Sequence, residues 1–126
     1  MRYTLRINGR LSGLNEYIAS CRMNRYKGAN LKEKNEAIIL AAIHEQLRRV
    51  KIDKPVYMRY RWYEKDRRRD LDNISSFGRK VIQDALVKSR VLKNDGWREI
   101  VGFRDDFFID GKHPRIEVVI EEVVIE

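Results

Sequence analysis

Residues 66 to 73 read Asp66-Arg67-Arg68-Arg69-Asp70-Leu71-Asp72-Asn73, and the rest of the chain is best understood outward from this stretch. Before it, apolar residues alternate with polar ones, which predicts a strand. After it, apolar residues recur at helical spacing. The stretch therefore predicts a strand–loop–helix unit whose loop carries concentrated charge of both signs.

The two carboxylates of this stretch, Asp70 and Asp72, stand one residue apart behind three arginines. Carboxylate oxygens suit hard cations such as Mg²⁺ or Mn²⁺, and the arginines would hold a polyanion beside them. A simpler interpretation is also open. Charged runs commonly form solvated loops, and Asp72 and Asn73 are ordinary residues for a helix N-cap.

The flanking elements follow from periodicity. Residues 56 to 63 alternate as a strand, with Val56, Met58, Tyr60 and Trp62 on one face. A helix is predicted from about Leu71 to Arg90. At 100° per residue, one stripe of this helix is polar and the other side is apolar. The polar stripe comprises Asp72, Asn73, Lys80, Gln83 and Asp84, and the apolar side comprises Ile74, Phe77, Val81, Ile82 and Ala85.

The N-terminal half predicts a strand and a helix. Residues 3 to 7 alternate as a strand, and Asn8-Gly9 marks a turn. Residues 10 to 29 are irregular and basic, so they form either a nucleic-acid-contacting loop or a long connection with one short helix. A helix is predicted from Asn30 to about Val50, because Asn30 and Glu33 resemble a capping box.

The C-terminal part predicts two strands, residues 97 to 109 and 114 to 124, joined as a hairpin at Asp110-Gly111-Lys112. We expect Trp97 to pack against the second helix, and Asp105 and Asp106 to face solvent or protect a strand edge. Residues 118 to 125 form a buried strand or part of a dimer seam.

The expected fold class is α+β: a small mixed sheet of about four strands with two main helices on one face. A single domain spanning residues 1–126 is expected from the length.

The composition narrows the class of protein. The chain has 27 Lys+Arg against 19 Asp+Glu, a formal charge of +8, which indicates a polyanionic partner. Cys21 is the only cysteine, so an intrachain disulfide and a zinc finger are excluded. The longest apolar run, residues 37 to 43, is far shorter than the ~20 residues that span a bilayer. No signal peptide is apparent, and we expect a soluble, cytoplasmic protein.

The chemistry that needs carboxylates beside cationic side chains is phosphodiester hydrolysis. Asp95, in the turn Asn94-Asp95-Gly96, is the candidate third metal ligand, although the same tripeptide is also ordinary turn chemistry. Lys80 could neutralise charge at the reacting phosphate. It could equally form an exposed ion pair with Asp84, contributing well under ~1 kcal/mol.

Together, Asp70-Leu71-Asp72-Asn73, the downstream Asp84-Ala85-Leu86 and the acidic turn at Asn94-Asp95 closely resemble the RusA family of Holliday junction resolvases. The resemblance implies a Mg²⁺-dependent homodimer, with Mn²⁺ as a plausible substitute, that cuts four-way DNA in a paired, symmetric manner. It also implies that Asp70, Asp72 and Asp95 bind the metal, and that the chain is of phage or prophage type.

The chain departs from the family pattern at two points. Ser76 stands where the family commonly has its lysine, and Lys80 takes that place about one helical turn further along. The acidic turn is often a pair of aspartates, and here its first residue is Asn94.

Branched double-stranded DNA is the expected partner. The expected DNA contacts are Arg67, Arg68, Arg69, Asn73, Arg22, Arg25 and Lys27. Two alternatives stay open: a non-catalytic basic DNA-binding module with structural carboxylates, and a related nuclease acting on flaps or forks.

Overall fold

The structure of the protein is a computed structural model, and it describes residues 1–124. Its elements, in chain order, are β1 (Arg2–Asn8), α1 (Leu14–Met23), α2 (Arg25–Gln46), β2 (Val56–Glu64), α3 (Leu71–Lys88), β3 (Ile100–Ile109) and β4 (Arg115–Glu122). The last residue of the predicted apolar tail, Ile125, lies outside the described residues. Within residues 1–124, no helix combines the length and the hydrophobicity that crossing a bilayer requires.

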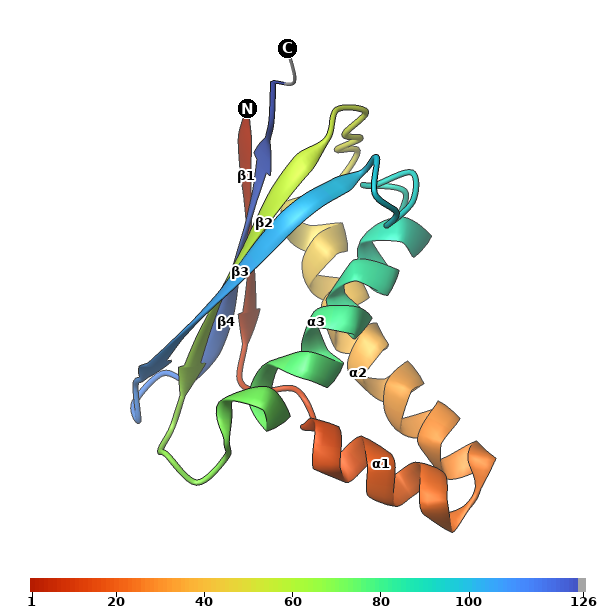
Figure 1. Ribbon diagram of the computed structural model, residues 1–126, viewed down its shortest axis with the longest axis vertical. Helices are drawn as coiled ribbons and strands as arrows, with labels where there is room; N and C mark the ends of the chain where they lie inside the picture. The colour runs from red at the N-terminus through yellow and green to blue at the C-terminus, as the bar shows by residue number, and fades with distance from the viewer. Residues whose placement is uncertain (125–126) are drawn as a thin grey trace.

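The strands form one four-stranded mixed sheet in the order β1-β4-β2-β3. Strand β4 runs antiparallel to both β1 and β2, whereas β3 runs parallel to β2 and occupies one edge. The helices lie together on one side of the sheet (Figure 1). The α+β class with a mixed sheet is therefore confirmed, with α1 as a third helix beyond the two main ones.

The predicted C-terminal hairpin is wrong. The segment after Ile109 does turn at residues 110 to 114, but β4 does not pair with β3, because β2 lies between them. The turn instead crosses the end of β2, where Asp110 N donates to the carbonyl of Glu64 at 2.8 Å. A turn signal fixes where the chain reverses, but it does not decide which strand edge the returning strand meets.

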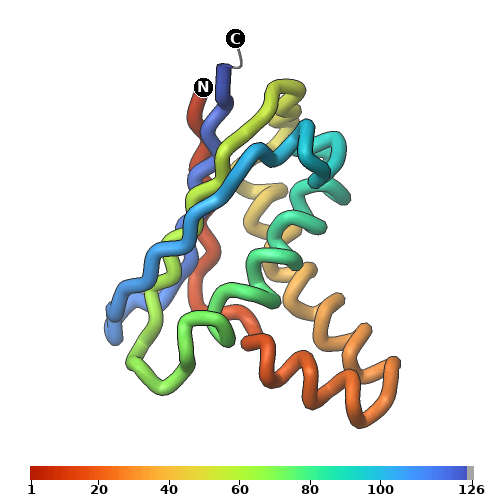
Figure 2. The backbone as a smooth tube through the Cα atoms, viewed as in Figure 1, coloured from red at the N-terminus to blue at the C-terminus, as the bar shows by residue number. Residues whose placement is uncertain are grey.

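Figure 2 shows α2 and α3 on one side of the sheet. The buried core residues come mainly from these two helices and from the strands that they face. Every second residue of β2, from Val56 to Glu64, is buried, which confirms the predicted alternation. The predicted apolar side of α3 is also confirmed. Its buried members include Ile74, Phe77, Val81, Ile82 and Ala85.

The region between β1 and β2 differs from its prediction. Residues 14 to 23 form α1, and α2 begins at Arg25 rather than at Asn30. Its N-cap is Asn24, whose side-chain oxygen accepts a hydrogen bond from Lys27 N at 2.9 Å. The predicted capping box at Asn30 is therefore wrong, because that residue already lies in the second turn of a helix. Helix α2 also ends earlier than predicted, at Gln46.

Helix α1 is held against the first turn of α3. The side-chain oxygen of Asn73 accepts a hydrogen bond from Asn15 N at 2.8 Å. Gly13, which precedes α1, lies so close that a Cβ atom there would stand 2.6 Å from the same Asn73 oxygen. The absence of a side chain at position 13 therefore allows α1 to approach the start of α3.

Replacing Gly13 with alanine should lower the free energy of unfolding by about 1–3 kcal/mol, the usual cost of overpacking a close contact. The added methyl would displace the Asn73 amide and break its bond to α1. Chemical denaturation measures the change. Gly111→Ala is the control, because a Cβ there meets its nearest atom at an ordinary 3.4 Å. Equal stability of the two variants would contradict this account of α1.

Candidate functional site

The two carboxylates of the motif stand at the start of α3. Asp70 is the N-cap residue, with extended backbone angles (φ −66°, ψ 153°), and its side chain makes no capping bond. Asp72 lies in the first helical turn, where its Oδ1 accepts a hydrogen bond from the Ser76 hydroxyl at 3.0 Å. Both side chains are exposed. Because both carboxylates are exposed and only two positions apart, the pair is suited to bind a cation from solution.

A buried carboxylate, that of Glu64, fixes the loop that carries the motif. Glu64 ends β2 on its buried face and is 5% exposed. Its Oε1 lies 3.2 Å from Arg10 Nη1 and 3.9 Å from Arg69 Nη1. Arg69 also donates to the carbonyl of Leu11 at 3.1 Å and to Glu16 at 2.7 Å. Arg69 therefore holds the loop in place. The sequence analysis predicted it as a DNA contact and did not anticipate this structural role.

The other two arginines of the motif point outward. The side chain of Arg68 is 86% exposed, and its only ion pair within residues 1–124 is a 3.7 Å contact with Asp66. Arg67 is also exposed, and the described part of the chain gives it no ion pair. These two guanidinium groups are therefore available to a polyanion, whereas that of Arg69 is not.

A hollow of about 620 Å³ opens beside Asp70, between the motif loop and the end of β3. Asp70, Arg67 and Arg69 supply its charged wall, and Phe107 and Phe108 supply its apolar wall. The hollow is large enough for several atoms of a bound DNA backbone with their waters.

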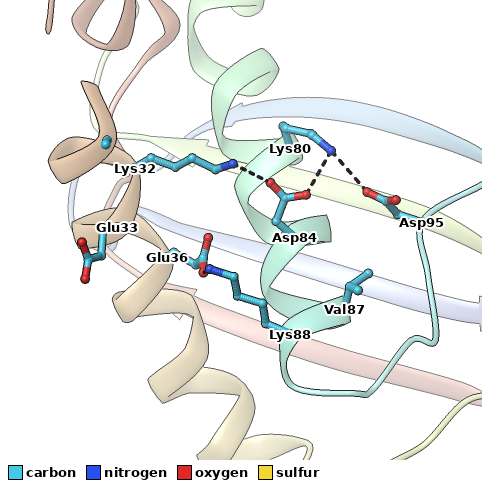
Figure 3. Close-up of a pocket in the computed structure, with 9 residues that line it drawn as sticks. Lys32, Glu33, Glu36, Lys80, Asp84, Val87, Lys88 and Asp95 are labelled. Carbon is cyan, nitrogen blue, oxygen red and sulfur yellow. Dashed lines mark hydrogen bonds and ion pairs between the residues drawn. The ribbon is translucent and has the colours of Figure 1, made fainter. Parts of the chain in front are cut away.

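Lys80 and Asp95 line a second hollow, of about 530 Å³, between α2 and α3. Lys80 lies 3.3 Å from Asp95 and 3.0 Å from Asp84, and Lys32 of α2 lies 2.9 Å from the other oxygen of Asp84. Figure 3 shows this alternating row of charges crossing from α2 to the turn after α3. Lower in the same hollow, Lys88 pairs with Glu36, a carboxylate that is almost fully buried.

The predicted site residues thus fall into two groups. Lys80 lies eight residues after Asp72, which corresponds to about 12 Å of helical rise. Within residues 1–124, no three Asp, Glu, His or Cys side chains gather closely enough to hold one metal ion. Asp70 and Asp72 are near neighbours in sequence at the start of α3, and the structure places Asp95 beside Lys80. It does not bring Asp95 into one cluster with Asp70 and Asp72.

Two carboxylates are nevertheless a fitting donor set for the ion that the resemblance implies. Mg²⁺ commonly keeps several waters and binds proteins through one or two carboxylates, with substrate phosphates completing its shell. Asp70 and Asp72 are exposed and lack a lysine or arginine partner among the described residues. Asp95, by contrast, already pairs with Lys80.

The remaining expected DNA contacts lie apart from the motif loop. Arg22, Arg25 and Lys27 stand where α1 turns into α2, at the end of α1 away from the loop (Figure 1). All three are exposed, and Arg25 lies over the Tyr26 ring, 5.2 Å from its centroid. Asn73 is partly occupied, because its oxygen bonds α1.

One sequence expectation near the site is wrong, and one of the two alternatives for a second residue is excluded. Trp97 does not pack against α3, since it is 97% exposed. Asp105 does not simply face solvent: it accepts a hydrogen bond from the Trp62 indole at 3.0 Å and pairs with Arg79. The missed acid Glu64 did carry a signal, because it continues the buried alternation of β2 by one more step.

The comparisons with known proteins agree with the motif. The family described as Endodeoxyribonuclease RusA matches residues 14–121. No curated protein matches the chain. Because the match covers most of the chain, this protein belongs to the RusA family, whose members are DNA-cutting hydrolases that resolve Holliday junctions.

The charge row predicts a pH-dependent stability. Burial raises the pKa of the Asp84 carboxyl, but the bonds from Lys32 and Lys80 outweigh it and lower that pKa below its usual 3.8. Because the carboxyl has a lower pKa in the folded protein than in the unfolded chain, it stabilises the fold at any pH above its unfolded-state pKa. This contribution disappears as the pH falls through the pKa of the folded state. Asp84→Asn should therefore cost about 1 kcal/mol at pH 7 and progressively less below about pH 4.

Denaturation of wild type and Asp84→Asn between pH 7 and pH 2 measures this difference. Asp53→Asn is the control, because Asp53 is exposed and makes no ion pair in residues 1–124. A difference that stays constant, or grows, on acidification would show that the row contributes nothing through its charge.

Proposed function

We propose that this chain is a Mg²⁺-dependent endonuclease that resolves four-way DNA junctions by paired, symmetric cuts, acting as a homodimer. Membership of the RusA family supports the junction substrate. The observation that carries the metal dependence is the exposed pair Asp70 and Asp72 at the start of α3, beside two outward-pointing arginines. The alternative of a non-catalytic DNA-binding module is disfavoured, because the family is one of nucleases.

Asp70 and Asp72 would hold the ion, and Asp95 is proposed as the third carboxylate from the resemblance. Mn²⁺ should substitute, since it accepts the same oxygen donors. When bound, the ion would lower the pKa of a water and neutralise charge on the leaving oxygen. The Ser76 hydroxyl, which donates to Asp72, would hold that carboxylate in a single orientation.

Arg67 and Arg68 would hold the DNA backbone beside the carboxylates. Arg67 lines the hollow that opens at Asp70, and Arg68 is the next residue of the same loop. Each guanidinium can donate to phosphate in a bidentate manner. Contacts of this kind read the shape of the backbone rather than the base sequence. A junction, in which backbones converge, would then be favoured over a linear duplex.

Lys80 would act only after exchanging a partner. Its bond to Asp84 and its contact with Asp95 raise the pKa of the ammonium group, so it is charged at neutral pH. It is 60% exposed, and a phosphate entering the second hollow could replace Asp95 as its partner. Lys80 is thus the proposed counterpart of the family lysine. It lies about one turn further along α3, because Ser76 occupies the position where the family commonly has that lysine.

Two-fold symmetry of the enzyme explains symmetric cuts. One chain of 126 residues offers little surface for four duplex arms, whereas a symmetric dimer presents two identical sites to a two-fold substrate. A cytoplasmic location, expected from the sequence, stays a prediction.

Asp72→Asn should bind a four-way junction about as tightly as wild type and cut it at least about a hundredfold more slowly, because a metal ligand contributes several kcal/mol at the transition state. The measurement uses a labelled junction and a matched linear duplex, each with Mg²⁺ or with EDTA. Asp53→Asn is the matched control, an exposed aspartate outside the site.

Flap and fork substrates in the same salt separate junction resolution from the related nuclease activities. Faster cutting of flaps or forks than of junctions would redirect the proposal to those substrates. Near-wild-type cutting by Asp72→Asn would remove Asp72 from the site.

The two neighbouring arginines should behave differently. Arg68→Ala should weaken junction binding and reduce the salt slope of the binding constant by about one, as expected for one lost phosphate contact. Arg69→Ala should instead lower the free energy of unfolding by about 1–3 kcal/mol, because it leaves Glu64 buried with fewer donors. Binding titrations at several salt concentrations and denaturation curves measure both. Interchanged effects would contradict the division of roles.

A further inference from the structure

A basic hollow lies at the end of α3 that is remote from the motif loop. It measures about 730 Å³ and opens where the connection after α2 meets the connection after α3 (Figure 1). Backbone bonds hold the two connections together. Ile52 N donates to the carbonyl of Val91 at 2.8 Å, and Val56 N donates to that of Glu99 at 2.8 Å. The 18 residues of α3, about 27 Å of helical rise, separate this hollow from the carboxylates of the motif.

The rim of the basic hollow carries positive charge that the described chain does not neutralise. Two acidic residues line it, Asp53 and Glu99, against five cationic ones. The cationic residues are Lys51, Lys54, Arg90, Lys93 and Arg98. All five are exposed, and within residues 1–124 none of their side chains forms a hydrogen bond or an ion pair. The negative ends of α2 and α3 supply about one elementary charge together, so an excess of positive charge remains for an anionic ligand.

Two arginines at this end of the molecule occupy a backbone conformation that favours glycine. Arg90 follows the cap of α3 with a φ of 65°, and Arg49 lies shortly after α2 with a φ of 64°. Arg49 lines a small hollow together with Ser89, so the two helix ends are neighbours. Glycine is the usual residue at such left-handed positions. Positive charge stands here although glycine would fit the backbone better, and unfavourable conformations of this kind concentrate at functional sites.

A fully exposed tryptophan stands beside the basic hollow. Trp97 is 97% exposed and directly precedes Arg98, which lines that hollow. Trp97 itself lines a neighbouring hollow of about 300 Å³ with Val101 and Phe103, both of which are partly exposed. An aromatic, apolar surface and a cationic surface therefore meet at the turn between α3 and β3. Proteins that bind single-stranded nucleic acid combine these two elements, because cations follow the phosphates while bases stack on aromatic rings.

We propose that Trp97 and the basic hollow bind an unpaired stretch of DNA, with phosphates on the cationic rim and one base stacked on the indole. The strand must be unpaired, because the faces of bases inside a duplex are covered by their neighbours. This site goes beyond the cleavage proposed above. It holds a strand at the end of α3 opposite to Asp70 and Asp72, and it needs no metal ion.

Tryptophan fluorescence tests the site directly, because the chain has two tryptophans and one of them is inaccessible: Trp62 is 1% exposed. In EDTA, oligothymidylate of about eight nucleotides should quench the emission of Trp97 in a saturable manner. An abasic oligomer of the same length should compete with it at least about fivefold more weakly, since it has phosphates but no bases to stack. Absence of quenching, or equal competition by the abasic oligomer, would overturn the proposal.

Variants locate the stacking contact. Trp97→Ala should weaken the binding of a fluorescein-labelled oligothymidylate at least about fivefold, as expected for the loss of one stacked base. Trp97→Phe keeps an aromatic ring and should bind nearly as tightly as wild type. Fluorescence anisotropy measures both, and circular dichroism verifies that the variants are folded. Unchanged binding by Trp97→Ala, or an equal loss in Trp97→Phe, would contradict stacking on this residue.

The salt dependence of the quenching tests the cationic rim. Arg98→Ala should reduce the salt slope of the binding constant by about 0.7, the value for one phosphate contact on a single strand. Lys34→Ala is the matched control, because Lys34 is exposed on α2 and lines neither hollow. Equal slopes for the two variants would remove the rim from the site.

These measurements use no divalent metal, so their outcome is separate from that of the cleavage assays. Asp72→Asn should be quenched as wild type is, because Asp72 lies at the other end of α3. Failure of the nuclease assay together with saturable quenching would leave the strand site standing. Quenching by a matched duplex as strong as that by the single strand would overturn the requirement for an unpaired base.

Discussion

The placement of the charged motif depends on one buried carboxylate. Glu64 ends β2 inside the protein, where an unpaired charge would be costly. Its cationic neighbours come from two other segments: Arg10 from the connection after β1, and Arg69 from the turn before α3. The connection after β1 is thereby joined to the end of β2 and to the turn before α3, at the point where the motif begins. Asp70 and Asp72, which directly follow this cluster in the chain, are exposed to solvent.

The elements with strong periodicity could be predicted from the sequence, and those defined by long-range choices could not. Strand β2 and helix α3 alternate or recur regularly over many residues, so their faces were predicted well. Helix α1 has no buried residue, which removes the apolar stripe that would have revealed it. Asn30 and Glu33 have the spacing of a capping box, but Asn24 already caps the helix one and a half turns earlier. The pairing of β4 with β2 was hidden because turn residues give no information about distant strands.

The exposed position of the two candidate carboxylates could be predicted from the sequence, whereas the contacts of the nearby arginines and lysine could not. Asp70 and Asp72 stand out because acidic residues at that spacing precede a helix, and the structure exposes both. The three arginines before Asp70 are identical in type, so nothing in their sequence separated the half-buried partner of Glu64 from the two exposed ones. Asp95 and Lys80 were expected beside the motif, yet the rise of α3 carries them toward the second hollow. Helical geometry thus decided what residue types alone could not.

The side-chain amide of Gln46, at the end of α2, accepts a hydrogen bond from Arg6 N and donates one to Arg6 O, each at 2.7 Å, and so covers part of the outer edge of β1. A sheet with two open edges can add copies at both sides, and such growth has no natural end. Gln46 occupies the backbone groups of Arg6 that an incoming strand would need. A strand arriving at this part of β1 would have to displace the Gln46 amide before it could pair with Arg6. One glutamine side chain thus protects part of an exposed sheet edge against unlimited strand addition.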